Sequence, residues 1–201
     1  MTDATIFIVD DDPAIQDSLS WLLETVGYSV KAFLSAQAFL DAFTPEMRGC
    51  MILDIRLPGM SGLQLQQKMT ADGIRLPVII ISGHGDIPMA VKAMQQGALT
   101  FLEKPFRDQE LLDSIQDALE RDDKNRKIDS LREQVKQRLD TLTPREHEVL
   151  ERIVEGDSSR VIGEFYDISV KTVEVHRAHV MEKMQAKSLP ELVQMVLSLR
   201  D

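Results

Sequence analysis

The sequence predicts an α/β doubly wound five-stranded parallel sheet, followed by a long linker helix and an all-α four-helix domain. Three observations support this prediction. Apolar runs alternate with helix-like stretches over residues 1–120, as in βαβ units. Helical spacing then continues through residues 121–138, and residues 139–201 contain three clear helix starts and one further short helix. We therefore expect domains over 1–120 and 139–201, joined by a helical linker.

The strands of the first domain are predicted from continuous apolar runs, which are typical of strands buried on both faces. These runs cover residues 6–9, 50–53, 78–81 and 99–102, and a more polar strand is expected over 28–33. Ligands of open α/β sheets bind beyond the carboxyl ends of the strands. Each apolar run is followed by polar residues, which we expect to converge at one edge: Asp10, Asp11, Asp12, Asp54, Ser82, Glu103 and Lys104.

Helices are expected between these strands, with boundaries set by capping and helix-breaking residues. The expected helices cover residues 13–26, 35–43, 62–70 and 88–96, and Asp108 is expected to cap the last helix. That helix continues past residue 120 as an apolar stripe with steps of 3, 4, 4 and 3 residues. A solvated linker helix and a short two-stranded coiled coil both fit this stripe. Its members are Ile128, Leu131, Val135, Leu139 and Leu142.

Capping signals also define the helices of residues 139–201. Thr143 and Ser188 are each followed three positions later by a glutamate, the order of a capping box, and Ser169 caps a third helix. A short helix is expected between residues 156 and 167. The two short helices joined by residues 167–169 are compatible with a helix-turn-helix.

Composition restricts the class of protein. No apolar stretch approaches the ~18 residues of a membrane span, and the N-terminus lacks a secretory signal, so we expect a cytoplasmic protein without membrane contact. The single cysteine, Cys50, excludes a disulfide framework. The net charge of −10 argues against nucleic-acid binding, but residues 168–189 carry four basic and two acidic side chains. Any DNA contact is therefore expected to be local and weak per subunit.

The residues at the strand ends are suited to phosphoryl transfer. A carboxylate can attack a phosphoryl group when the charge on the phosphoryl oxygens is neutralised. Asp54 is the candidate nucleophile, and Asp10, Asp11 and Asp54 offer the carboxylates that Mg²⁺ prefers. Lys104 and the Ser82 hydroxyl would meet the phosphoryl oxygens. Asp12 is interpreted as a solvated residue at a helix N-terminus, and His84 as a turn residue without a chemical role.

Residues 1 to about 120 resemble the receiver domain of two-component response regulators, which has a flavodoxin-like fold. The motifs that carry this resemblance are Asp10-Asp11, residues 54–62, residues 82–86 and Lys104-Pro105-Phe106. The resemblance implies that Asp54 accepts a phosphoryl group from a sensor histidine kinase. It implies Mg²⁺ (or Mn²⁺) bound by Asp11, Asp54 and the Arg56 carbonyl, with Asp10 assisting through water. It also implies a cis bond before Pro105 and an aromatic switch at Phe101.

Residues 143–199 are similar to the LuxR-type DNA-binding domain, and the whole chain resembles the FixJ subfamily. Residues 172–177 match best, whereas Ser159, Gly163 and Tyr166 depart from the asparagine, alanine and leucine expected in the preceding helix. A glycine within a helix costs roughly 1 kcal/mol, which places the stability and docking of that helix in question.

A helical wheel sorts the expected recognition helix into two faces. Val173, Val180 and Met184 form the core face. Val175 lies on the opposite face, where its aliphatic side chain could contact a thymine methyl group. The alternative is that Val175 is an exposed valine without a role in DNA binding. Arg177 falls near the buried edge and is assigned to phosphate or to an internal contact. The candidate DNA-binding residues are Lys171, Thr172, Glu174, Val175, Arg177 and His179.

These observations together predict a transcriptional regulator controlled by phosphorylation of Asp54, which shifts it to a dimeric state that binds promoter DNA. RNA polymerase is then an expected partner, and the chain is not expected to be a turnover enzyme. The last helix is apolar over a wide arc, so one side is expected to face the core and the other a second subunit. Two alternatives are a phosphatase that uses Asp54 as a transient nucleophile, and a receiver whose output helices bind protein instead of DNA.

Overall fold

The computed structural model describes residues 4–83 and 87–199, and the chain divides into two units, Met1–Asn125 and Arg126–Asp201. The first unit contains a parallel sheet with strand order β2-β1-β3-β4-β5, which confirms the predicted five-stranded doubly wound sheet. Because all strands run the same way, their carboxyl ends lie at one edge. The strands are β1 (Thr5–Val9), β2 (Ser29–Phe33), β3 (Gly49–Asp54), β4 (Val78–Ser82) and β5 (Thr100–Glu103).

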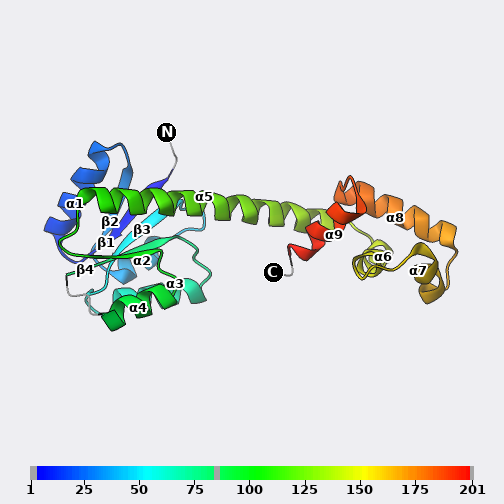
Figure 1. Cartoon of the computed structure of the whole chain (residues 1–201), viewed down its shortest axis with the longest axis horizontal. Coiled ribbons are helices and arrows are strands. Elements are labelled where there is room, and N and C mark those ends of the chain that lie inside the picture. The colour runs from blue at the N-terminus through cyan, green and yellow to red at the C-terminus, as the bar shows by residue number, and fades with distance from the viewer. Residues whose placement is uncertain (1–3, 84–86, 200–201) are drawn as a thin grey trace. The chain divides into compact units, whose positions relative to one another are not determined.

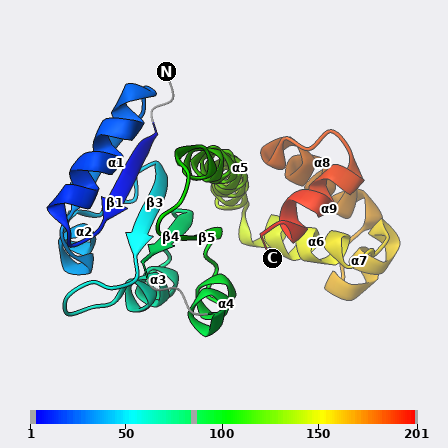
Figure 2. The same cartoon turned by 60° about the vertical axis from the view of Figure 1, so that its left-hand side comes forward.

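Helices cover both faces of this sheet, so the central strands are buried on both sides (Figure 2). One face packs against α1 (Pro13–Thr25) and the first part of α5 (Asp108–Leu139). The other packs against α2 (Ala36–Ala42), α3 (Gly62–Ala71) and α4 (Ile87–Gln95). All six residues of β3 are buried, which explains why its sequence lacks the alternation of a half-exposed strand.

Capping residues begin the helices of the first unit close to the predicted positions. Ser35 caps α2 as predicted, and its hydroxyl accepts a hydrogen bond from the Ala38 N–H. Asp12 has a more definite role than the predicted solvated bystander, because its carboxylate caps α1 by accepting from the Ala14 N–H at 2.9 Å. Asp108 is the first residue of α5 and not its cap, so that expectation was wrong by one position.

The second unit is helical and packs around one core cluster. It contains α6 (Pro144–Val154), α7 (Ser159–Tyr166), α8 (Val170–Met184) and α9 (Leu189–Leu197). The predicted capping box at Thr143 and Glu146 is formed in both directions. The second predicted box differs: the Ser188 hydroxyl accepts from the Glu191 N–H, but Glu191 itself accepts from the Lys187 N–H, one residue further back.

Helix α5 is a single unbroken helix of 32 residues (Figure 1), and its last turns belong to the second unit. Val135 and Leu139 pack in the core of that unit. The Arg132 Nε donates to the Ser198 carbonyl at the end of α9, and an Arg138 guanidinium nitrogen donates to the Met184 carbonyl at the end of α8. Both arginines thus satisfy helix C-termini, where cations are favoured.

The apolar stripe of the predicted linker is therefore divided between two environments. Val135 and Leu142 are buried, whereas Ile128 is 41% exposed and Leu131 is 61% exposed. The unit boundary at residues 125 and 126 differs from the expected start of the output domain at residue 139, because local helical spacing does not report which tertiary core receives each apolar residue. The coiled coil, one of the two interpretations of the five-residue stripe, is untested, and only Ile128 and Leu131 of that stripe are exposed.

Two further features concern reactivity and membrane association. Burial of the Cys50 thiol, with a smaller contribution from the nearby Asp122 carboxylate, raises its pKa to about 12. A thiol with this pKa is almost entirely protonated at neutral pH and is a poor nucleophile. Across residues 4–83 and 87–199, no helix is both long and apolar enough to cross a membrane.

We expect Val135→Ala to lower the free energy of unfolding of the second unit by about 2 kcal/mol, because two buried methyl groups are lost and a cavity remains. Leu131→Ala is the matched control on the same helix, and its effect should stay within about 0.5 kcal/mol because the side chain is exposed. Urea unfolding followed at amide signals of α6 and α8 measures both values. Equal effects of the two substitutions would contradict the assignment of Val135 to this core.

Candidate functional site

The centre of the candidate site is Asp54, the last residue of β3. Its side chain is 10% exposed, so the carboxylate is largely buried but still in contact with solvent. One carboxylate oxygen accepts a hydrogen bond from the Lys104 ammonium at 3.0 Å, and the other accepts from the Arg56 N–H at 2.6 Å. Both oxygens are therefore oriented by donors, one of them charged.

Lys104 joins this carboxylate to a second one. Its ammonium also lies 2.9 Å from Asp10, whose side chain is 3% exposed. Burial of the ammonium favours its neutral form, but hydrogen bonds to Asp10 and Asp54 outweigh burial and raise the pKa of Lys104 above its usual value. The lysine is thus held in its charged form between two buried carboxylates that are 44 positions apart in sequence.

A glycine allows the loop after Asp54 to close tightly. A Cβ atom at Gly62 would lie 2.2 Å from the Asp54 carbonyl oxygen, a separation that two such atoms cannot adopt. The Gly62 N–H donates instead to the Ile55 carbonyl at 2.9 Å, which brings the start of α3 against the end of β3. The sequence indicated Gly62 only as a member of the motif at residues 54–62. Its steric role is seen in the structure, where its backbone lies close to the Asp54 carbonyl.

The residues proposed to hold a metal ion lie at the same edge. The backbone N–H of Asp12 donates to the Asp10 carboxylate at 2.9 Å, which fixes that side chain, and Asp11 is exposed beside it. The residues that the structure covers contain no preassembled cluster of three or more metal-ligating side chains. The donor chemistry nevertheless fits a hard divalent cation, because carboxylate and carbonyl oxygens are the ligands that such cations prefer.

The other predicted residues of this edge come from β4 and β5. Ser82 is 1% exposed at the end of β4, and its carbonyl accepts from the Lys104 N–H at 2.8 Å. Phe101 is half-buried and packs against the core on the face covered by α2, α3 and α4. The peptide bond between Lys104 and Pro105 is cis, as predicted. His84 lies outside the described residues.

The predicted core face of the recognition helix is confirmed. Val173, Val180 and Met184 of α8 are fully buried, whereas Val175 is 47% exposed although it lies in the same helix. Lys171, Thr172 and Glu174 are exposed as well, all in the first two turns. A helix that presents one face to the core and these side chains to solvent can enter a major groove.

Glycine also allows the turn before this helix to close. Asp167 is the C-cap of α7, and its φ of 52° is left-handed. A Cβ atom at Gly163 would lie 2.8 Å from the Ile168 carbonyl oxygen. The Gly163 carbonyl accepts from the Ile168 N–H at 3.0 Å. The glycine therefore has a packing role in the turn between α7 and α8, and the doubt that the sequence raised about the docking of α7 is resolved.

A buried carboxylate beneath α8 was missed as an interaction site by sequence reasoning. Glu146 is 4% exposed and lies 2.6 Å from the Lys183 ammonium. The His179 Nδ1 lies 3.5 Å from the other oxygen of the same carboxylate. His179, a candidate DNA contact, thus faces Glu146 with a side chain that is 53% exposed. Arg177 is half-buried and one of its terminal nitrogens has no hydrogen-bond partner within the described structure, so its proposed phosphate contact is still a prediction.

Both units match known protein families. Residues 6–116 match the response regulator receiver domain, and residues 140–196 match the luxR family of bacterial regulatory proteins. The chain is 43% identical to the transcriptional regulatory protein FixJ of Bradyrhizobium diazoefficiens over 98% of its own length and 96% of that protein. It is 41% identical to the transcriptional regulatory protein TdiR of Thauera aromatica, over 96% of the chain and 86% of that protein.

Solved structures agree with these matches over nearly the full length. The response regulator StyR has a TM-score of 0.83 and 40% identity, with 98% of this chain and 99% of that chain covered. Full-length FixJ from B. japonicum has a TM-score of 0.61 and 42% identity, with 100% and 98% covered.

The buried Glu146 makes the stability of the second unit depend on pH. Burial disfavours its ionised form, but hydrogen bonds from Lys183 and Thr143 outweigh burial and lower its pKa from 4.5 to about 2. Since the pKa is lower in the folded state, the stabilisation is complete above about pH 4.5 and is lost as the pH falls toward 2. Urea unfolding at a series of pH values should show this loss at the α6 and α8 signals.

Glu146→Gln should remove this component of the pH dependence. Glu148→Gln is the matched control, because the Glu148 side chain is 47% exposed and should leave the dependence as in the parent. A Glu146→Gln variant that loses stability with acid as steeply as the parent would show that another group is responsible.

Proposed function

Because the chain belongs to the FixJ-type response regulators, with a receiver and a LuxR-type DNA-binding domain, we propose that Asp54 is the residue through which its activity is controlled. The chain is a DNA-binding transcriptional regulator of a two-component system, and its partners are a sensor histidine kinase and DNA. The observation that carries the proposal is the Asp54 carboxylate at the end of β3, oriented by the Lys104 ammonium and the Arg56 N–H.

In the proposed reaction, an Asp54 carboxylate oxygen attacks the phosphorus of a phosphohistidine. The bond from phosphorus to the imidazole nitrogen breaks, the nitrogen keeps the electron pair and takes a proton, and an acyl phosphate forms on Asp54. The Lys104 ammonium already contacts Asp54 and is close to where negative charge accumulates on the phosphoryl oxygens. The chain itself then acts once per phosphoryl group, as an acceptor and not as a turnover enzyme.

Receiver domains bind a divalent metal in the phosphorylation site, and we propose Mg²⁺ (or Mn²⁺) here. Asp10, Asp11, Asp54 and the Arg56 carbonyl would hold it. When bound, the ion neutralises charge on the phosphoryl oxygens. The exposed Asp11 supports this assignment, because its carboxylate follows the buried Asp10 directly in sequence and is open to solvent.

The acyl phosphate is proposed to act by changing the partners of Lys104 and Ser82. The added phosphoryl oxygens compete with Asp10 for the Lys104 ammonium and accept from the Ser82 hydroxyl, and Phe101 follows into the space that is vacated. This shifts the population toward a dimer. On α9, Leu192 is buried while Leu189 and Leu197 are 41% and 44% exposed, which supports a second apolar face for a partner subunit.

Dimerisation would compensate for the weak charge of each DNA-binding unit. Residues 168–189 contain four basic and two acidic side chains, so their net charge is only +2. Two linked half-sites gain affinity because the second contact is intramolecular. We propose that the dimer binds promoter DNA in the cytoplasm. RNA polymerase is the proposed partner whose activity at the promoter responds to the bound dimer.

The test of this proposal adds acetyl phosphate and Mg²⁺ to the protein and follows intact mass, oligomeric state and promoter binding. The parent should gain one phosphoryl group, dimerise and bind more tightly, and Asp54→Asn should do none of these. Asp72→Asn is the control, because Asp72 follows α3 directly and forms a surface ion pair with Lys68, so this variant is expected to behave as the parent. Phosphorylation and dimerisation of Asp54→Asn would exclude Asp54 as the acceptor.

Substitutions on α8 distinguish a base contact from a phosphate contact. Val175→Ala should weaken binding to the specific promoter by about fivefold, because an apolar contact worth roughly 1 kcal/mol is lost, with the salt dependence unchanged. Lys171→Ala should weaken specific and non-specific binding alike and lower the salt slope by about one.

Val161→Ala is the control for these variants, since Val161 is a 41% exposed valine on α7, outside the recognition helix. If binding of the parent to promoter DNA does not weaken as salt rises, phosphate contacts do not contribute to it and the assignment of Lys171 is wrong.

A further inference from the structure

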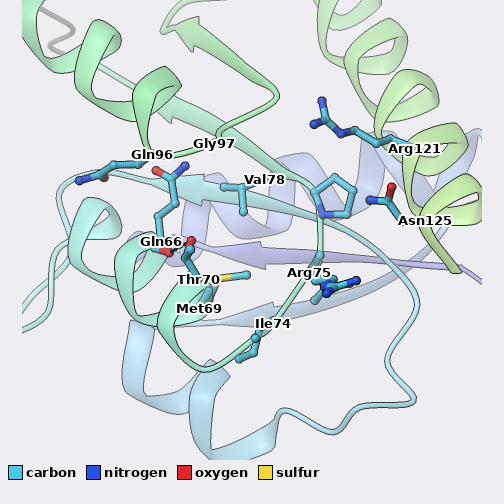
Figure 3. Close-up of a pocket in the computed structure, with 13 residues that line it drawn as sticks. Gln66, Met69, Thr70, Ile74, Arg75, Val78, Gln96, Gly97, Arg121 and Asn125 are labelled. Carbon is cyan, nitrogen blue, oxygen red and sulfur yellow. Dashed lines mark hydrogen bonds between the residues drawn. The ribbon is translucent and has the colours of Figure 1, made fainter. Parts of the chain in front are cut away.

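The receiver unit contains a cavity at the edge opposite to Asp54. Its volume is about 420 Å³, and it is lined by the end of α3, the segment from Gly73 to Pro77, the start of β4, the residues after α4 and the α5 helix (Figure 3). Val78, the first residue of β4, lines the cavity. Ser82, at the other end of the same strand, belongs to the proposed phosphorylation site. The cavity is therefore separate from the site described above.

Two residues that line this cavity have a buried amide oxygen without a hydrogen-bond partner within residues 4–83 and 87–199. Gln66 is 3% exposed, and its Nε2 donates to the Ala93 carbonyl at 3.1 Å, which fixes the orientation of the amide. Its Oε1 is left buried without a hydrogen bond in the described part of the chain, and so is the Oε1 of Gln96. An unsatisfied buried acceptor costs about 1–3 kcal/mol, so a pair of them in one cavity calls for a donor.

The opposite end of the cavity is cationic. Figure 3 shows Gln66 and Gln96 together at one end, and Arg75, Arg121 and Asn125 at the other. Arg121 is exposed, and among the described residues it forms no ion pair at this position. Between the two ends the wall is apolar, with Met69 and Val78 among its members. The cavity thus offers acceptors at one end, an apolar middle and guanidinium groups at the other.

We propose that this cavity binds a small ω-amino carboxylate. The ammonium group supplies N–H donors to the two glutamine oxygens, the methylene chain lies against the apolar wall, and the carboxylate meets the guanidinium of Arg121. Guanidinium groups present paired donors that match a carboxylate, which favours this direction over the reverse. The proposal does not depend on phosphorylation of Asp54.

An internal arrangement competes with a ligand. Rotation of the Gln96 amide by half a turn would place its Nε2, a donor, where its Oε1 now lies, so this end of the cavity would no longer present two acceptors. In this arrangement water fills the cavity. Titration with an amino carboxylate would then shift the glutamine signals no more than titration with a probe that lacks one of its charged groups.

The experiment records the side-chain amide signals of Gln66 and Gln96 in the full chain during titration with 5-aminopentanoate. Pentanoate and pentylamine are the matched probes that each lack one end, and 4-aminobutanoate and 6-aminohexanoate vary the length. We expect saturable shifts with at least one amino carboxylate, and at least tenfold weaker binding of pentanoate and pentylamine.

Two variants assign the ends of the ligand. Arg121→Gln should reduce the affinity for the amino carboxylate to that of pentylamine, and Gln96→Met should reduce it to that of pentanoate. Arg160→Gln is the control, because Arg160 is an exposed arginine of the second unit with a side chain that is 82% exposed. The proposal is overturned if none of the three amino carboxylates gives a saturable shift at either glutamine, or if the one-ended probes bind equally well.

Discussion

The receiver unit depends on one interaction, the contact of the Lys104 ammonium with the carboxylates of Asp10 and Asp54. Two buried carboxylates at one sheet edge repel each other, and removing the partner of a buried charge costs about 3–5 kcal/mol. The lysine therefore stabilises the edge and also restricts it. A group that adds negative charge to Asp54 attracts the same ammonium more strongly. The neutralisation of the Asp10 charge by Lys104 therefore changes whenever the charge on Asp54 changes.

Much of this edge could be predicted because the relevant signals are local. A buried parallel strand has a continuous apolar sequence, and in such a sheet the residue after each strand lies at a known edge. These two rules predict one common edge for Asp10, Asp54, Ser82 and Lys104, although the four residues lie at the ends of four different strands. The steric role of Gly62 could not be predicted, because it depends on how closely one backbone segment approaches another.

The less predictable features all involve partners far apart in sequence. Glu146 could be recognised as half of a capping box, since its partner is three residues away, but its contact with Lys183 spans 37 positions. The same limit applies to α5, in which Val135 and Leu131 have similar sequence surroundings but only Val135 meets a core. Helical periodicity identifies a face and leaves open which element covers that face.

The buried contact between Glu146 and Lys183 has a consequence for recognition. It attaches the last turn of α8 to the start of α6, so the direction of the recognition helix is set when the unit folds. A helix that is already oriented loses little conformational entropy when it enters a groove. If the proposed contacts of the exposed N-terminal turns are made, discrimination between operators rests on the few side chains there, and new side chains at these positions should change operator preference with no change in the packing beneath.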